Sequence, residues 1–506
     1  MKPKGIVYLV GAGPGDAGLL TLRGAVLLKR ADVVVYDALV NSELLQLAPK
    51  SAEIIYGGKR AKGPIVPQEN LNRLLIDKAG EGKTVVRLKG GDPYVFGRGG
   101  EEAEELADAG VPFEVVPGVS SFVAVPNYAG VPLTHRDFAS KLTLITGHED
   151  PSKEQSRIDW AQVAKTPGTK VIMMGTDRIG EIADMLIKHG MGPKTPVAIT
   201  QWGTTERQVS VSGPLSDIGR LATAKKIGPP TVAVIGEVVK LREKLNWFER
   251  RPLFGTKVIV TRARDQVTKL AEQLKELGAE ILEAPSIRIE APTNREDLVD
   301  ALLELNAYDW LVFTSPNGVT QFFEYFFRQF HDMRDIGGAR IAAVGPATAN
   351  KLKELHLQVD LMPEEALATS IAEEFAEFES VENLRICLLR SEVANSELPK
   401  ALEALGAIVD DIACYRTAAD GGDSGVEDKI RETGADWLTF TSGSTVDSFH
   451  TRFDLPVLLK KHPQMRIASI GPETSKALET LKIKPTVEAQ EHTVDGLVDA
   501  LVKNGA

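Results

Sequence analysis

Short apolar runs alternate with amphipathic stretches along the first half of the chain. The apolar runs have the length of buried strands, and the stretches between them carry apolar residues at helical spacing. This alternation predicts an α/β fold in which helices cover the faces of a sheet. Two groups of strands are predicted, the first at 6–10, 33–37, 85–89 and 113–118 and the second at 141–147, 169–175, 195–200 and 231–236.

Proline and glycine mark the boundaries between domains. Both are frequent near 118–135, which predicts a break between two subdomains. The segment LNWFERRPLFG (245–255) looks like a helix end followed by a turn, and a new strand begins directly after it. We therefore predict a first domain over 1–248 with subdomains of about 1–118 and 119–248, a linker over 249–255, and a second domain over 256–506.

The second half contains an internal repeat with a nearly constant offset. Arg262 lies 128 residues before Arg390, and Trp310 lies 127 residues before Trp437. Two copies are too few for a solenoid, so the repeat predicts two similar α/β lobes. Small ligands usually bind in clefts between such domains. The matching segments are 257–281 with 385–409, 308–323 with 435–450, and 340–355 with 466–481.

Composition narrows the class of protein. The 506 residues are 43% hydrophobic and 25% charged, with a formal net charge of −11. These values exclude a disordered or collagen-like chain and give no general attraction to nucleic acid. No apolar run approaches the ~20 residues that span a bilayer. The eight histidines form no HExxH motif and no close His/Cys cluster, so we expect no bound metal.

The two cysteines indicate the compartment. Cys387 and Cys414 lie in apolar runs and form no CxxC motif. This pattern predicts buried, reduced thiols, which are typical of a cytoplasmic protein.

One glycine-rich motif is a candidate cofactor-binding site. GPGDAG (13–18) follows the first predicted strand and fits GxGxxG, and Asp37 ends the next strand about 20 residues later. Read alone, the motif suggests a dinucleotide site and an NAD-dependent oxidoreductase. Pro14 weakens this interpretation, because it stiffens a loop whose glycines normally approach a pyrophosphate. The structural alternative is a tight turn between a strand and a helix, for which the glycines alone are sufficient.

Longer motifs give a more specific resemblance. VYLVGAGPGDAGLLTLRG, VVRLKGGDPYVFGRGGEE, AGVPLTHRDFA and VVKLREKLNWF occur in this order within residues 1–248. Over this range the chain resembles uroporphyrinogen-III C-methyltransferase. The resemblance implies a two-subdomain tetrapyrrole methylase fold, S-adenosylmethionine as cofactor, double methylation of uroporphyrinogen III to precorrin-2, and a homodimer. A later corrinoid methylase is an alternative, and RLKGGDPYVFGRGGEE argues against it.

The same resemblance implies roles for single residues. Asp37 matches the proposed proton acceptor and Lys59 the proposed donor, in a reaction whose pyrrole-type carbon becomes nucleophilic by losing a proton. A helix cap for Asp37 and a solvated lysine for Lys59 are the structural alternatives. Arg98, Glu101 and Arg136 match residues that relatives use at the substrate. The two arginines suit its carboxylates, because arginine binds carboxylates in a bidentate manner. The cofactor contacts would be Pro14, Gly90, Gly91, Asp92, Val95, Ser120, Ser121, Met174 and Gly203.

Residues of about 253–506 resemble uroporphyrinogen-III synthase. The resemblance rests on VIVTRAR, two FTS strands, two Gly-Pro turns and ACYRT (413–417). It implies two α/β lobes joined by a two-stranded linker. It also implies an enzyme that closes hydroxymethylbilane to uroporphyrinogen III, with loss of water and inversion of the last ring. The lobes would span about 256–287 with 418–506, and about 290–412.

No nucleophile elbow, Cys/His pair or carboxylate dyad is evident in the sequence of the second half. Holding the substrate in a ring-closing shape can therefore matter more than any single acid. Tyr415 matches a family tyrosine thought to assist departure of the hydroxyl, and packing on a linker strand is the alternative. Arg262, Thr348 and Thr474 are further substrate candidates. Four turns are expected to place free backbone N–H groups at helix N-termini, at 314–318, 345–348, 441–445 and 471–474. Such groups can bind a polyanion, and the alternative is that these residues are ordinary N-caps.

The two resemblances together indicate a bifunctional enzyme, since the product of the synthase is the substrate of the methyltransferase. The expected partners are small tetrapyrroles, with no nucleic acid and no membrane. A two-lobed ligand-binding protein built on the repeat is the alternative outside enzymes. No dehydrogenase-chelatase segment precedes residue 1, so we do not expect this chain to complete sirohaem by itself.

Overall fold

The computed structural model describes residues 5–58, 68–148, 158–261, 264–284, 287–363, 370–419 and 424–505. It divides into two compact units. The first consists of Met1–Thr256 with Lys275–Glu280 and Gly505–Ala506, and the second of Lys257–Leu274 with Ile281–Asn504.

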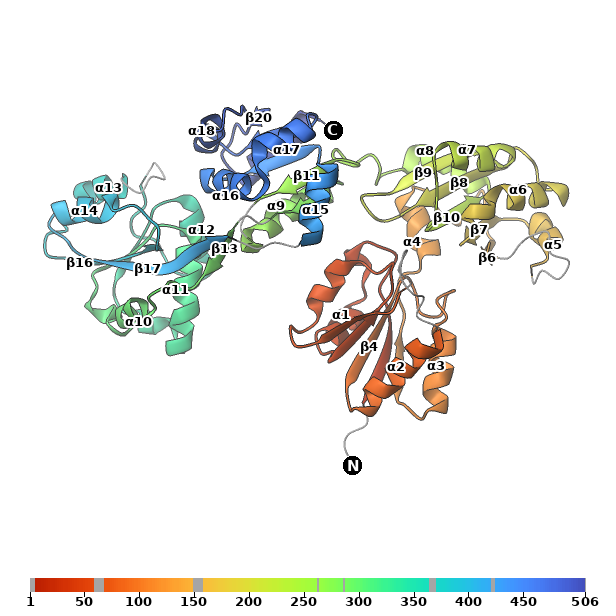
Figure 1. Ribbon diagram of the computed structural model, residues 1–506, viewed down its shortest axis with the longest axis horizontal. Helices are drawn as coiled ribbons and strands as arrows, with labels where there is room; N and C mark the ends of the chain where they lie inside the picture. The colour runs from red at the N-terminus through yellow and green to blue at the C-terminus, as the bar shows by residue number, and fades with distance from the viewer. Residues whose placement is uncertain are drawn as a thin grey trace. The chain divides into compact units, whose positions relative to one another are not determined.

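The first unit opens with a five-stranded parallel sheet in the order β3-β2-β4-β1-β5. Val7 and Leu9 of β1 pack into one core cluster and Val10 into another, so successive side chains enter opposite faces. Helix α1 covers one face, and α2 and α3 cover the other (Figure 1). Burial on both faces explains the nearly continuous apolar runs in the sequence. The elements are β1 (Ile6–Gly11), α1 (Leu22–Leu28), β2 (Val33–Tyr36), β3 (Glu53–Tyr56), α2 (Gln68–Gly80), β4 (Thr84–Lys89), α3 (Gly99–Asp108) and β5 (Phe113–Val116).

Helix α4 (Ser121–Tyr128) connects this sheet to a second, mixed sheet in the order β6-β7-β10-β8-β9. Val125 of α4 packs against Val171 and Val232 on one face, and α5, α6 and α7 cover the other face. Because β10 runs antiparallel to both β7 and β8, the carboxyl ends of β7 and β8 lie at the same edge. The elements are β6 (Leu142–Thr146), α5 (Trp160–Lys165), β7 (Thr169–Met173), α6 (Ile179–Lys188), β8 (Pro196–Gln201), β9 (Val209–Pro214), α7 (Ile218–Ala224), β10 (Thr231–Ile235) and α8 (Arg242–Leu245).

The second unit contains two further five-stranded sheets, in the orders β12-β11-β18-β19-β20 and β13-β17-β16-β14-β15. The short β13 pairs antiparallel with the end of the long β17, and both strands join the two lobes (Figure 1). The pair of α/β lobes with a two-stranded linker is therefore confirmed. The strands are β11 (Lys257–Val260), β12 (Glu280–Glu283), β13 (Ile287–Glu290), β14 (Trp310–Phe313), β15 (Arg340–Ala343), β16 (Arg385–Ser391), β17 (Ile408–Ala419), β18 (Trp437–Phe440), β19 (Arg466–Ser469) and β20 (Val487–Glu488).

Helices complete both lobes of this unit. They are α9 (Arg264–Glu276), α10 (Glu296–Leu303), α11 (Pro316–Gln329), α12 (Pro346–Glu354), α13 (Ser370–Phe378), α14 (Glu397–Ala404), α15 (Ser424–Thr433), α16 (Gly443–Phe453), α17 (Leu455–Lys461), α18 (Pro472–Thr480) and α19 (Val494–Lys503).

The sequence repeat is also a repeat of contacts. Trp310 opens β14 and Trp437 opens β18, and both side chains are fully buried. Arg340 lies over the ring of Trp310 at 4.3 Å, and Arg466 lies over the ring of Trp437 at 4.2 Å. The same cation–π contact thus closes the same edge of each lobe.

The two cysteines are buried and free, as the sequence predicts. Cys387 lies in β16 and Cys414 in β17, and burial raises the pKa of both thiols. Among the helices of the described ranges, none is long and apolar enough to cross a membrane.

Three glycines bring the carboxyl ends of β1, β4 and β5 together. A Cβ atom added at Gly118, just after β5, would lie 2.2 Å from the carbonyl oxygen of Gly91 and 2.6 Å from the Cα of Gly11. Both contacts are to backbone atoms, so a side chain at Gly118 would force the strand ends apart.

Replacement of Gly118 by alanine should therefore lower the free energy of unfolding of the first unit by at least ~1–3 kcal/mol, the usual cost of overpacking. Denaturant unfolding followed by circular dichroism measures the change. Gly100→Ala is the matched control, because nothing lies within 4 Å of the added Cβ in α3. Equal stability of the two variants would contradict the close approach.

Candidate active site

Several candidate residues meet at the carboxyl edge of the first sheet. Pro14 follows β1, Asp37 follows β2, Gly90 follows β4, and Ser120 follows β5 as the N-cap of α4. All five strands of this sheet are parallel, so their carboxyl ends lie on one side. Open α/β sheets bind ligands outside this edge.

Backbone contacts between two of these turns build one frame. The Gly91 N–H donates to the Gly13 carbonyl at 2.7 Å, and the Gly13 N–H donates back at 3.2 Å. Gly91 has a φ of +69°, in the left-handed region that favours glycine. The Asp92 carboxylate accepts the N–H of Tyr94 at 2.9 Å and that of Gly118 at 3.0 Å. Asp92 therefore holds the turn after β4 against the turn after β5.

The GPGDAG motif does not lead directly into a long helix. It is followed by a three-residue 3₁₀ helix, Ala17–Leu19, and α1 starts only at Leu22. Asp16 caps the 3₁₀ helix by accepting from the Gly18 N–H at 2.7 Å, and it also accepts from the Tyr128 hydroxyl at 2.7 Å. A pyrophosphate site needs a helix N-terminus directly after the glycines, so this geometry argues against the dinucleotide interpretation.

The second sheet brings a further loop to the glycine motif. Gly203 and Thr204 follow β8, and the Thr204 hydroxyl oxygen accepts the Asp16 N–H at 3.1 Å. A Cβ atom at Gly203 would lie 2.4 Å from Val125, so only glycine fits there. Met174 follows β7, whose carboxyl end lies at the same edge as that of β8 with β10 between them. It is half exposed and has a φ of +54°. Such left-handed backbone is strained for a methionine and is typical of functional sites.

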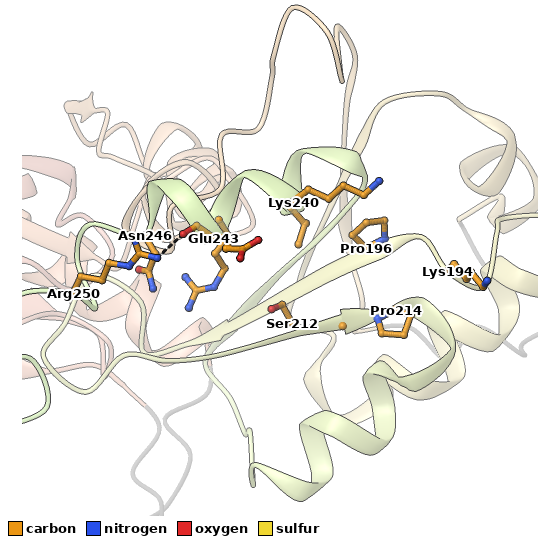
Figure 2. A pocket seen from close by; sticks show the side chains of 11 residues that line it. Lys194, Pro196, Ser212, Pro214, Lys240, Glu243, Asn246 and Arg250 are labelled. Carbon is orange, nitrogen blue, oxygen red and sulfur yellow. Dashed lines mark hydrogen bonds between the residues drawn. The ribbon is translucent and has the colours of Figure 1, made fainter.

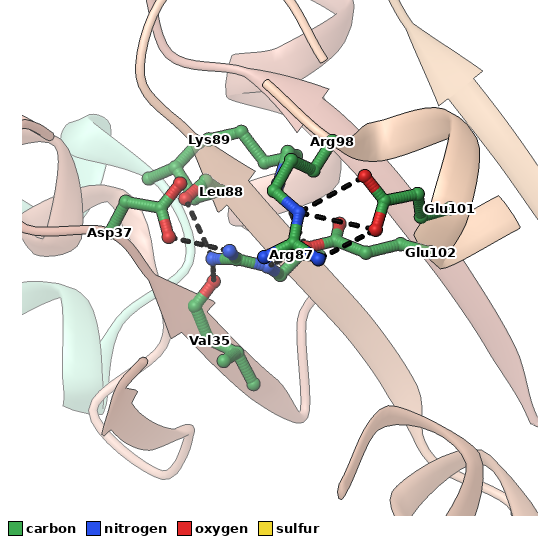
Figure 3. Close-up of polar contacts among 8 residues, drawn as sticks. All are labelled: Val35, Asp37, Arg87, Leu88, Lys89, Arg98, Glu101 and Glu102. Carbon is green, nitrogen blue, oxygen red and sulfur yellow. Dashed lines mark hydrogen bonds and ion pairs between the residues drawn. The ribbon is translucent and has the colours of Figure 1, made fainter. Parts of the chain in front are cut away.

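A buried chain of charges runs beneath Asp37 (Figure 3). The Arg87 guanidinium donates to Asp37 Oδ1 at 2.5 Å and to Glu102 Oε1 at 3.2 Å. The Lys89 ammonium donates to the same Glu102 oxygen at 2.8 Å. Arg87, Lys89 and Glu102 are buried, whereas the Asp37 side chain keeps 30% of its surface exposed. Asp37 is therefore fixed from below and open toward solvent.

The alternation of β4 explains this cluster. Val85 faces the core cluster that contains α2 and α3, and Arg87 and Lys89 follow at intervals of two on the same face. Burial lowers the pKa of the Lys89 ammonium, and the nearby Arg87 lowers it further, while Glu102 and Asp37 oppose both effects. Sequence reasoning missed Arg87, Lys89 and Glu102 as site residues. Two cations inside an otherwise apolar strand were the available signal.

The proposed substrate residues of the first unit are exposed, and they lie at the start of α3 or in a turn after α4. Arg98 has a φ of +59° at the N-terminus of α3 and forms an ion pair with Glu101 at 2.6 Å. The hydrogen bond from Arg98 lowers the pKa of the Glu101 carboxyl. Val95 is half-buried in the turn before α3, and Arg136 is exposed in the turn between His135 and Ala139.

Ser120 and Ser121 begin α4, and Ser120 is buried. Two candidates, Lys59 and Arg262, lie outside the described residues.

In the second unit, Tyr415 lies on β17 with only 7% of its surface exposed. Its hydroxyl is 3.0 Å from the hydroxyl oxygen of Ser315, which caps α11 by accepting the Gly318 N–H. Thr348 and Thr474 occupy equivalent positions in α12 and α18, and both are 3% exposed. The structure therefore brings Tyr415 to a helix N-terminus, while it directs the two threonines into the interior of their lobes.

A cavity of about 540 Å³ lies elsewhere in the first unit (Figure 2). It borders the start of β8 at Pro196, whereas Gly203 follows the opposite end of that strand. None of the candidate residues that the structure describes lines it. The lining residues are Lys194, Pro196, Ser212, Gly213, Pro214, Val239, Lys240, Arg242, Glu243, Asn246 and Arg250. In the part of the chain that the structure describes, no group of three or more His, Cys, Asp or Glu side chains could hold a metal ion.

Comparison with known proteins covers both units. The family of tetrapyrrole (corrin/porphyrin) methylases matches residues 6–219, and the family of uroporphyrinogen-III synthase HemD matches residues 268–499. A porphyrin biosynthesis protein HemD of Ruminiclostridium josui is 38% identical over 507 residues, which cover 99% of this chain and 98% of that relative.

Two further relatives match the first unit. An S-adenosyl-L-methionine-dependent uroporphyrinogen III methyltransferase of Methanosarcina barkeri is 52% identical over 48% of this chain and 94% of its own length. The crystal structure of the uroporphyrin-III C-methyl transferase of Thermus thermophilus with S-adenyl homocysteine has a TM-score of 0.40. It is 42% identical over 46% of this chain and 99% of that one.

Replacement of Glu102 tests the buried charge cluster. Glu102→Gln leaves Arg87 and Lys89 without their shared carboxylate, so the free energy of unfolding should fall by ~3–5 kcal/mol. The double variant Lys89→Met/Glu102→Gln removes one buried charge of each sign and should recover most of this loss. Denaturant unfolding of both variants measures the difference, and equal stability would show that the two groups are not coupled.

The pH dependence of the free energy of unfolding is a second test of the same charge cluster. Because the pKa of Lys89 is lowered on folding, the unfolded chain binds more protons between that pKa and ~10.4, and stability should rise with pH in this window. Lys89→Met should lack this contribution.

Proposed function

Because this chain belongs to the tetrapyrrole methylases over its first half and to the uroporphyrinogen-III synthases over its second, we propose that its two units catalyse consecutive reactions. The second unit closes hydroxymethylbilane to uroporphyrinogen III with loss of water. The first unit methylates that product twice with S-adenosylmethionine and forms precorrin-2. The observation that carries the assignment of the site is the meeting of glycine-containing turns with Asp37 at one edge of the first sheet.

The turns at this edge would hold the methyl donor. S-adenosylmethionine supplies an electrophilic methyl group on a sulfonium centre. Gly90 and Gly91 let the backbone approach a bound molecule, and Asp92 fixes their turn through two N–H groups. We assign the remaining contacts to Pro14, Val95, Ser120, Ser121, Met174 and Gly203. The hydrogen bond between Asp16 and Thr204 supports placing Gly203 beside Pro14.

Asp37 would accept the proton that the substrate releases. Its Oδ1 is held by Arg87, and the side chain still reaches solvent, so the orientation of the carboxylate is fixed before a substrate arrives. Lys59 would return a proton, a role that we carry over from the resemblance.

Arg98 and Arg136 would bind carboxylates of the substrate. A chain with a formal charge of −11 needs such local cations for a polyanion. Both arginines are exposed, and the Arg98–Glu101 pair is open to exchange with a substrate carboxylate.

In the synthase, Tyr415 would assist departure of the hydroxyl group. Its hydrogen bond with Ser315 supports this role, because it holds the phenol at the N-terminus of α11. Electron-rich pyrroles expel hydroxide with little help, so positioning would carry most of the catalysis. Arg262 remains a proposed substrate contact, and the burial of Thr348 and Thr474 favours a structural role for these two residues.

Two wider properties follow from the resemblance and the composition. We propose that the protein is a homodimer through its methyltransferase unit. We also place it in the cytoplasm, because free buried thiols are typical of a reducing compartment.

Asp37→Asn should lower methylation of uroporphyrinogen III by at least ~10²-fold, since general-base catalysis is typically worth ~10²–10⁴-fold. Binding of S-adenosylhomocysteine and cyclisation of hydroxymethylbilane should stay unchanged. Asp77→Asn, on the exposed surface of α2, controls for the loss of one carboxylate. Methylation at the normal rate would make Asp37 a structural residue.

Tyr415→Phe should slow cyclisation by less than the ~10²–10⁴-fold typical of general-acid catalysis, because the substrate needs little help. Stopped assays of uroporphyrinogen III formation measure the rate, with Tyr325→Phe in the same lobe as control. An unchanged rate would leave Tyr415 as packing. Complete loss in a folded variant would show that the acid is essential.

A further inference from the structure

Glu249 lies at the start of the segment that the sequence suggests to be a linker, yet its side chain is only 16% exposed. Its carboxylate accepts hydrogen bonds from the Ser210 hydroxyl at 2.6 Å and from the Gln208 amide at 2.9 Å. It also accepts from the Asn246 amide at 3.1 Å and forms an ion pair with Arg242. A free linker has no need for a buried carboxylate with four donors.

These donors keep the carboxylate charged. Burial alone would raise the pKa of Glu249, but the bonds from Ser210 and Gln208 and the charge of Arg242 outweigh it and lower the pKa. The group is therefore a fixed anchor and not a proton carrier at neutral pH.

Gln208 connects this anchor to the loop after β8. Its side chain is 3% exposed, and its Oε1 accepts the Thr204 N–H at 3.0 Å while its Nε2 donates to Glu249. Trp202 and Thr204 flank Gly203 with φ values of +49° and +71°. Left-handed backbone is strained for residues other than glycine, so this loop needs external hydrogen bonds to keep its shape.

A second path links the same segment to the glycine motif. The ring of Tyr128 packs against Trp247 and Phe248, with centroids 5.1 and 4.8 Å apart. The Tyr128 hydroxyl donates to Asp16 Oδ2 at 2.7 Å, and burial raises its pKa, so the proton stays in place. The Asp16 N–H in turn donates to the Thr204 hydroxyl oxygen, and this hydrogen bond joins the glycine motif to the loop after β8.

We propose that Glu249 is a positioning residue of the methyl-donor site: through Gln208 it holds the Gly203 loop in the strained shape that meets the glycine motif. The proposal rests on the proposed function, in which Pro14 and Gly203 contact S-adenosylmethionine. The functional boundary of the methyltransferase then lies beyond Glu249, and the first residue of the apparent linker supports the cofactor site from outside it.

The test uses the full chain and S-adenosylhomocysteine as the probe in titration calorimetry. Glu249→Ala should raise the dissociation constant about tenfold or more, because the loop then samples other shapes. Glu243→Ala is the matched control, since this exposed carboxylate lies on the preceding helix α8. Cyclisation of hydroxymethylbilane by the same preparations should stay within twofold and reports on the amount of folded protein.

A double-mutant cycle separates positioning from general loosening. If Glu249 acts through Gln208, the dissociation constant of Gln208→Ala/Glu249→Ala should equal that of the weaker-binding single variant. Multiplying effects, or an unchanged constant in Glu249→Ala, would overturn the proposal. Should Glu249→Ala fail to fold, Glu249→Gln replaces it with an expected rise of about threefold, and no rise would overturn the proposal. Failure of the unaltered protein to bind the probe would instead contradict the proposed function.

Discussion

One buried carboxylate, that of Glu102, decides the geometry of the candidate methyltransferase site. Arg87 and Lys89 both point from β4 into the layer beneath α3, and Glu102 compensates them. Without that anion, two cations would face each other in a medium of low dielectric constant, where repulsion is large. With it, the guanidinium of Arg87 can extend to Asp37 and hold one of its oxygens. The orientation of the candidate base therefore depends on a residue of α3 that lies beneath the exposed surface of the site.

The elements of regular structure could largely be predicted from the sequence. Every strand expected in the first half exists, with ends that differ by one or two residues, because buried parallel strands leave continuous apolar runs. β3 and β9 were not predicted, because neither resembles a buried apolar run: β3 has exposed positions, and β9 contains serines and a glycine. The repeat predicted two lobes correctly, because the same buried tryptophan and arginine recur in both.

The contacts within the site could not be predicted in the same way. Turn residues such as Pro14 and Gly91 could be placed at one edge, since the carboxyl ends of parallel strands must lie together. Partners such as Glu102 and Glu249 depend on which helix or segment packs over a given strand, and local pattern does not contain that information. Glu249 in particular follows a helix end and precedes a proline, which is the ordinary pattern of a linker. Its burial is a property of the tertiary fold alone.

Under the proposed function, the charges also explain how an acidic chain can bind a polyanionic substrate. Arg98 is already paired with Glu101, and both side chains are more than half exposed. Exposed pairs of this kind contribute at most ~1 kcal/mol, so a substrate carboxylate can replace Glu101 at little cost. The buried ion pairs beneath Asp37 are different, because breaking them would leave an unpaired charge in the protein interior. Under the proposed function the site thus separates two tasks: exposed arginines exchange partners as substrates come and go, while the buried charges keep the base in one orientation throughout.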